Sequence, residues 1–225
     1  MVGKLIVQTL VFYALTAMLL FAAAGTWRWP QAWIFIVEMI ATGIAISMWL
    51  ARHDPGLLAE RMSSPIQRGQ AIGDKLILLF ICVAWPAWLV FIALDAKRWR
   101  LSHLPTWAQI AGALLILVAM YACYRTFREN SFAAPVVKIQ KERGQTVVTT
   151  GPYAVVRHPM YAGAGLMFFG IPMLLGSAWG LALGPAWYLL LALRIPLEER
   201  VLRENLAGYD DYARRVRWRL LPGVW

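Results

Sequence analysis

The first candidate for chemistry is the stretch Gln145–Tyr161, QTVVTTGPYAVVRHPMY, a polar interruption before the last hydrophobic block of the chain. Pro152 and Pro159 divide it, and each proline pushes its predecessor away from the α region. The stretch therefore predicts an ordered loop followed by a helix that begins near Pro159, since proline is tolerated in a first turn. Arg157 and His158 would then lie at the positive end of a helix dipole, which favours an anionic or polarisable ligand.

A second cluster of ionisable residues follows the last hydrophobic block. Arg194 and Glu198 are four positions apart, as are Glu199 and Arg203, so each pair shares a helix face. Such residues either form interfacial salt bridges, each worth well under about 1 kcal/mol, or hold a polar ligand at the end of a membrane helix. The spacing alone is compatible with both interpretations.

The composition indicates which elements position these residues. The chain has 225 residues, of which 60% are hydrophobic and 15% charged, whereas a soluble domain carries about 25% charged residues. Many of the 12 Trp lie near the ends of apolar runs, as in an interfacial aromatic belt. These features predict an all-α integral membrane protein, with residues 1–225 as one membrane domain. Cys82 and Cys123 lie inside apolar runs, so no disulfide framework is expected.

Hydropathy predicts about six transmembrane helices, or five plus a re-entrant hairpin made of the last two apolar runs. A span needs about 20 residues, and the candidate runs are Leu5–Ala24, Gln31–Leu50, Lys75–Leu94, Trp107–Tyr124, Pro159–Leu175 and Trp179–Leu193. The main predicted connections are a polar loop broken by Pro and Gly over Ala51–Asp74, a charged turn over Asp95–Pro105 and a basic amphipathic tail over Arg194–Trp225. Residues 1–124 thus hold four N-terminal spans, and residues 125–225 form a C-terminal region with the candidate site.

The positive charges are unevenly distributed among these connections. The net charge is +10. In the predicted membrane topology every Lys and Arg, including Arg68, falls on the same side of the membrane, except Arg28, Lys97, Arg98 and Arg100. The positive-inside rule therefore predicts that both termini and both long loops are cytoplasmic, with a cofactor pocket on that side. The charge does not indicate nucleic-acid binding, because the aromatic residues lie in apolar runs and do not interleave with a basic groove.

The run GPYAVVRHPMYAG resembles the RHPxYxG signature of the isoprenylcysteine carboxyl methyltransferase family and its relatives. A second family element follows at a matching distance, with RIPLEE starting at Arg194 and GYDDY starting at Gly208. The resemblance identifies residues 125–225 as a methyltransferase-like region. It implies an S-adenosylmethionine-dependent enzyme, in contact with membrane lipids, that methylates a lipophilic or lipidated acceptor.

The resemblance also implies roles for individual residues. Arg194 would hold the carboxylate end of the acceptor and take part in catalysis. Independently of the resemblance, Arg128 and Asn130 lie where the fourth predicted span meets the cytoplasmic loop, and this patch either binds lipid headgroups through its arginines or lines the acceptor pocket. The cofactor would contact Gln145, Thr146, Val147, Val148, Tyr153, His158, Pro159, Met160, Tyr161, Glu198 and Glu199. Family members often have His at the position of Gln145, where Gln can also exchange hydrogen bonds.

Several alternatives accompany this interpretation. The expected acceptor is a carboxylate, of the prenylcysteine type or another lipid-linked acid, and a phospholipid amine is second. An NADPH-dependent sterol-type reductase and a non-catalytic membrane assembly factor are the alternatives from other classes.

Single residues also have alternative roles. His158 could only cap its helix and not contact the cofactor. Glu38, well inside a span, either contacts substrate or forms a structural hydrogen bond. No metal site is expected, because His53 and His103 have no Cys or His neighbours at ligand spacing. The segment from Tyr209 onward predicts an interfacial amphipathic helix or strap.

Overall fold

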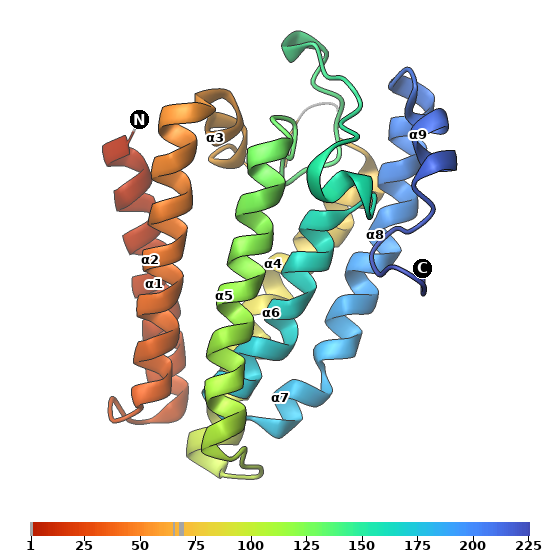
Figure 1. Cartoon of the computed structure of the whole chain (residues 1–225). Coiled ribbons are helices and arrows are strands. Elements are labelled where there is room, and N and C mark those ends of the chain that lie inside the picture. Colours follow the sequence, from red (N-terminus) through yellow and green to blue (C-terminus); the bar gives the residue numbers. More distant parts are fainter. Residues whose placement is uncertain (1, 65, 68–69) are drawn as a thin grey trace.

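The computed structural model describes residues 2–64, 66–67 and 70–225, and every regular element within them is helical (Figure 1). Pro65 and Gly69 of the predicted polar loop, and Arg68 of the predicted inside charges, lie outside the described residues. The long helices are α1 (Val2–Ala24), α2 (Pro30–His53), α4 (Ile72–Ala93), α5 (Thr106–Glu129), α6 (Pro159–Leu175) and α8 (Gly184–Asn205). The short ones are α3 (Pro55–Arg61), α7 (Ala178–Ala182), α9 (Tyr209–Arg215), the π-helical η1 (Leu94–Trp99), and the 3-10 turns η2 (Lys141–Arg143) and η3 (Gly151–Ala154).

The described residues contain 5 helical segments long and apolar enough to cross a bilayer, Gly3–Ala24, Pro30–His53, Ile72–Trp99, Thr106–Glu129 and Ala178–Asn205. α6 is also apolar but has 17 residues, a length of about 25 Å against a hydrocarbon core of about 30 Å. Figure 1 shows it running beside α5 between the two ends of the bundle. The predicted all-α, multi-pass membrane fold is confirmed, with α6 as its short member.

The connections gather at two opposite ends of the bundle (Figure 1). One end holds the N-terminus, α3, the loop that follows α5, and α9, whereas the other holds the α1–α2 turn and α7. The segments predicted to be cytoplasmic therefore share one end. This end carries the candidate site.

The last helix is longer than the hydropathy predicted. The apolar run ended at Leu193, whereas α8 continues through Arg194 and Pro196 to Asn205. The continuation is possible because Arg194 and Glu199 are buried against charges from other elements. An opposite charge with good geometry offsets the cost of removing an ion from water, so the polar residues did not end the helix.

The predicted polar loop over Ala51–Asp74 also contains helical structure. α3 follows Asp54, whose Oδ1 accepts a hydrogen bond from the Leu57 amide at 2.9 Å, an N-cap followed by proline at the first helical position. α4 begins at Ile72, so Asp74 lies in its first turn and is fully buried. The predicted loop is therefore much shorter than its polarity suggested.

The charged turn predicted over Asp95–Pro105 begins as a continuation of α4. Asp95 is buried in η1, where its Oδ2 accepts the hydroxyls of Ser102 and Ser177, both at 2.5 Å. These hydroxyls satisfy one oxygen of the carboxylate, which lets the helical path extend past the predicted end of the third span. Ser177 lies in the short connection between the last two predicted apolar runs, and its hydroxyl caps α7 by accepting a hydrogen bond from the Gly180 amide at 2.8 Å.

α5 and α6 approach each other closely. A Cβ added to Gly112 would lie 2.7 Å from the Gly170 carbonyl oxygen and 2.7 Å from the Met173 Cβ. Small residues of this kind allow membrane helices to pack backbone against backbone. Nearer the site, a Cβ added to Gly163 would lie 2.9 Å from the Ala122 Cβ, so close packing also fixes the start of α6 against α5.

Gly112→Ala should lower the free energy of unfolding by about 1–3 kcal/mol, because the added methyl group overpacks the α5–α6 contact. Gly43→Ala is the matched control, since a Cβ there meets nothing within 4 Å and alanine favours a helix. Unfolding in mixed detergent micelles, followed by circular dichroism, measures both variants. Equal stabilities would contradict the close approach of the two backbones.

Candidate functional site

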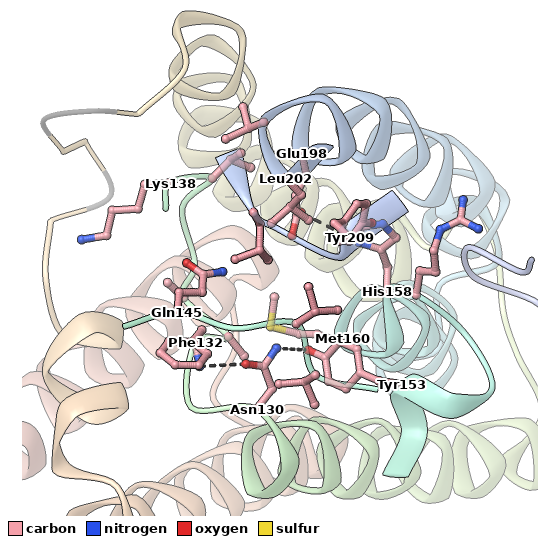
Figure 2. A pocket seen from close by; sticks show the side chains of 18 of the residues that line it. Asn130, Phe132, Lys138, Gln145, Tyr153, His158, Met160, Glu198, Leu202 and Tyr209 are labelled. Atoms are coloured by element: carbon pink, nitrogen blue, oxygen red, sulfur yellow. Dashed lines mark hydrogen bonds and ion pairs between the residues drawn. The ribbon is translucent and has the colours of Figure 1, made fainter. Parts of the chain in front are cut away.

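A polar cleft opens at the end of the bundle that holds the loop after α5 (Figure 2). Its walls come from this loop, the first turn of α6, the second half of α8, and α9. The space measures about 790 Å³ with its open mouth but encloses only about 90 Å³, whereas small-molecule sites measure roughly 300–1,000 Å³. A nucleoside-sized ligand therefore requires the loop to move outward.

Most of the predicted site residues meet in this cleft. Those that line it are Asn130, Gln145, Thr146, Val147, Val148, Tyr153, His158, Met160, Tyr161 and Glu198. The other four lie elsewhere. Pro159 is the first residue of α6, Arg128 is exposed on α5, and Arg194 and Glu199 are buried in ion pairs on α8.

Glu199 joins the start of α6 to α8 and to residues 216–219, here called the C-terminal strap. Its Oε1 accepts a hydrogen bond from Arg157 Nε at 2.6 Å and lies 3.3 Å from His158 Nε2, and its Oε2 accepts Arg219 Nε at 3.2 Å. The backbone amides of Arg157 and His158 donate to strap carbonyls at 2.9 Å each. Both carboxylate oxygens of Glu199 are thus engaged, and its effect on the cleft is to hold His158 in place.

Glu198, one residue earlier, faces the cleft. Its Oε2 accepts the Tyr161 hydroxyl at 2.6 Å and lies 4.0 Å from His158 Nδ1. The rings of His158 and Tyr161 stack with their centroids 5.6 Å apart. Within the described residues Glu198 Oε1 has no hydrogen-bond partner, and the side chain is 27% exposed. This oxygen can accept a ligand hydroxyl or face a ligand cation.

Tyrosine hydroxyls supply further polar groups. Asn130 Nδ2 donates to the Tyr153 hydroxyl at 2.7 Å, and the Tyr212 hydroxyl donates to the Tyr153 carbonyl at 2.8 Å. Tyr209 lines the cleft with a buried hydroxyl that has no hydrogen-bond partner in the described part of the chain. Burial raises the pKa of Tyr153 and of Tyr209 well above the ordinary value of about 10. Both phenols therefore stay protonated, and Tyr209 has a proton to donate to a ligand.

Arg194, on α8, is held by Asp74, which lies in the first turn of α4. Arg194 Nε donates to Asp74 Oδ1 at 2.6 Å, and its Nη2 donates to the Pro135 carbonyl at 2.7 Å. Asp74 Oδ2 accepts Gln70 Nε2 at 2.7 Å and the Val137 amide at 3.0 Å. This pair therefore fixes α4, α8 and the cleft wall around residues 135–137 to one another.

The salt bridges suggested by the four-residue spacing, Arg194–Glu198 and Glu199–Arg203, are not formed, because each buried charge has a partner from another element. Sequence reasoning missed Asp74 because the two partners are 120 positions apart. The one local signal was a carboxylate at the start of an apolar run.

A second, apolar cavity of about 490 Å³ lies between α1, α2, α3, α5, α6 and α8. Aliphatic and methionine side chains make up most of its lining, and Arg61 and Arg194 are its two cations. Met160 and Tyr161, in the first turn of α6, line both this cavity and the polar cleft. These two side chains are therefore the partition between a polar and an apolar compartment.

Asp74→Asn and Arg194→Gln should each destabilise the protein by about 3–5 kcal/mol, since each change strands a buried polar partner. The double variant should lose less than the sum of the two single losses. The exposed pair Arg203–Asp210 is the control, and breaking it should cost at most about 1 kcal/mol. Detergent unfolding curves of all variants provide the comparison, and strictly additive losses would mean that Asp74 and Arg194 do not interact.

Comparison with known proteins points to the same region of the chain. The family described as phospholipid methyltransferase matches residues 107–208. Protein-S-isoprenylcysteine O-methyltransferase B of Arabidopsis thaliana is 29% identical over 143 residues, which cover 63% of this chain and 70% of that protein. The nickel-cobalt-cadmium resistance protein NccN of Alcaligenes xylosoxydans xylosoxydans is 36% identical over 82 residues, or 35% of this chain and 37% of that protein.

The matched residues include the loop after α5, the first turn of α6 and the second half of α8, which form most of the cleft. The resemblance first seen in GPYAVVRHPMYAG is thereby confirmed, and the chain is a membrane methyltransferase. It is similar to the isoprenylcysteine carboxyl methyltransferase family over the region that holds the cleft.

Proposed function

We propose that the protein transfers a methyl group from S-adenosylmethionine to a lipophilic carboxylate that enters from the bilayer. The observation that carries this proposal is the shared partition, since Met160 and Tyr161 line both the polar cleft and the apolar cavity. A water-soluble donor in the cleft and a lipid-soluble acceptor in the cavity would meet at these two side chains. A single polar pocket would not explain why the same helix turn borders an apolar space.

The cleft residues suit the proposed cofactor chemically. The free carboxylate oxygen of Glu198 can accept hydroxyl or ammonium donors, and the unpartnered hydroxyl of Tyr209 can donate. Val147, Val148 and Leu202 supply apolar surface for a purine ring. One end of the Gln145 side chain is already hydrogen-bonded, because its Oε1 accepts the backbone amide of Gln140 at 2.8 Å. Its NH₂ group remains for a ligand.

When bound, S-adenosylmethionine supplies a methyl group whose bonding electrons stay on the departing sulfur, so a carboxylate acceptor gains the methyl without losing a proton. The protein must then orient the two partners and exclude water. Tyr161 is suited to orientation, because its hydroxyl is fixed by Glu198 and its ring lies 5.5 Å from the Arg194 guanidinium. Arg194 lines the acceptor cavity with its Nε fixed by Asp74, and its proposed catalytic role is to contact the acceptor through its remaining donors.

A phospholipid amine is the second candidate acceptor, favoured by the description of the matching family. An ammonium group must lose a proton before it can attack a methyl carbon, so this reaction needs a base. The two cationic residues of the apolar cavity support the carboxylate instead. Offering the purified protein a lipophilic acid and a phosphatidylethanolamine side by side would separate the two acceptors.

The cleft is proposed to open to the cytoplasm. The positive-inside distribution of Lys and Arg along the sequence supports this orientation. The connections predicted to be cytoplasmic also gather at one end of the bundle (Figure 1). Reporter fusions at Trp225 and within residues 96–100 should give an inside and an outside signal, respectively. Signals from the same side would contradict the proposed topology.

The decisive test is a binding titration of the purified protein with S-adenosylmethionine, S-adenosylhomocysteine and NADPH. The first two should bind saturably and NADPH should not. NADPH binding would favour a reductase, and the absence of binding by all three would remove the catalytic proposal.

Glu198→Gln should weaken S-adenosylmethionine binding at least tenfold, about 1.4 kcal/mol, because it removes a negative charge that faces the cleft. Tyr209→Phe should weaken it by about 0.5–1.5 kcal/mol through loss of one donor. Glu204→Gln is the matched control, since Glu204 is exposed on the same helix. If Glu198→Gln and Glu204→Gln bind equally well, Glu198 does not belong to the cofactor site.

A further inference from the structure

We propose that Arg61 binds the carboxylate of the acceptor at the polar end of the apolar cavity, and that the protein selects a long-chain lipophilic acid through this residue. The inference rests on the proposed function for the class of acceptor. The position and the charge of Arg61 are independent observations. Hydropathy gave no reason to single out this residue, which lies at the end of α3 in the predicted polar loop.

Arg61 lies against the partition between the two compartments. Its Nη1 donates to the Ala133 carbonyl at 2.9 Å and is 3.7 Å from the Met160 sulfur. Its guanidinium carbon lies 4.0 Å from the centroid of the Phe127 ring. A carboxylate paired with Arg61 would therefore sit beside Met160, which also borders the cofactor cleft.

The charge of Arg61 is not balanced by the protein. Arg194 and Arg157 are buried beside Asp74 and Glu199, whereas no carboxylate of residues 2–64, 66–67 and 70–225 lies within ion-pairing distance of Arg61. Burial lowers the pKa of Arg61, yet an arginine keeps its charge in proteins. A partly buried cation without a counterion favours an anionic ligand, and the planar guanidinium matches a carboxylate with two parallel hydrogen bonds.

The rest of the cavity suits the chain of such an acid. Its walls include Leu5, Met39, Ile46, Met120 and Met167 from four helices. Methionine side chains adapt to ligands of irregular shape. The combination of one unbalanced cation and a long apolar lining indicates a fatty or prenylated acid.

Methylation would change the affinity of this site. The carboxylate becomes a neutral ester, which can no longer form a charge-assisted pair with Arg61. Substrate should therefore bind more tightly than product. The site would release the ester into the bilayer without any movement of the cofactor loop.

The test uses the full-length protein in lipid nanodiscs without cofactor, and cis-parinaric acid and its methyl ester as fluorescent probes. The acid should bind at least tenfold more tightly than the ester. Arg61→Gln should remove this preference while leaving ester binding unchanged, and Arg61→Lys should keep part of it. Arg52→Gln is the matched control, because Arg52 is exposed at the end of α2, and it should keep the full preference.

Three outcomes would overturn the inference. These are equal binding of acid and ester by the wild type, an acid preference that survives Arg61→Gln, and a loss of preference in Arg194→Gln but not in Arg61→Gln. Tighter, Arg61-dependent binding of lysophosphatidic acid than of the fatty acid would overturn the choice of a carboxylate. The wild-type comparison needs no variant, so a misfolded Arg61→Gln does not block the test.

The S-adenosylmethionine titration separates this inference from the proposed function. Cofactor binding combined with a failed acid preference would overturn only the role of Arg61. An Arg61-dependent acid preference without cofactor binding would overturn the proposed methyl transfer and leave the acid site in place.

Discussion

The buried pair between Asp74 and Arg194 is the constraint on which the rest of the site depends. It joins two helices that are far apart in the sequence, and through the Pro135 carbonyl and the Val137 amide it also fixes the loop between α5 and α6. Without a counter-charge, a guanidinium this deeply buried in a membrane protein would end the helix or draw it toward water. The pair thus allows α8 to carry Glu198 past the apolar region and into the cleft.

The division of the interior into two compartments follows from the first turn of α6. Close packing on α5 and the ionic cluster around Glu199 hold this turn from both sides. Its side chains can therefore border a polar space and an apolar space at once. The proposed reaction between a water-soluble donor and a lipid-soluble acceptor needs such a boundary, because neither reactant dissolves well in the other's solvent.

The helical fold and the start of α6 could be predicted from local sequence signals, and most of the cleft residues from the family resemblance, whereas the ion pairs could not. The apolar runs marked the spans, and the proline pattern before Pro159 located the start of α6. The end of α8 and the role of Asp74 depended on partners far along the chain, which no helical periodicity encodes. From Tyr209 onward the sequence indicates only an interfacial amphipathic helix or strap. Only the three-dimensional arrangement places Tyr209 in the cleft.

The C-terminal strap has a consequence for how the protein is made. Its carbonyls hold the backbone of Arg157 and His158, and Arg219 completes the contacts of Glu199. During translation, residues 216–219 leave the ribosome after every other segment of the cleft. The helices can enter the bilayer one after another, but the first turn of α6 acquires its final support only when the strap arrives. A nascent chain therefore cannot complete the cleft until synthesis has passed residue 219, which delays ligand binding until the membrane bundle has assembled.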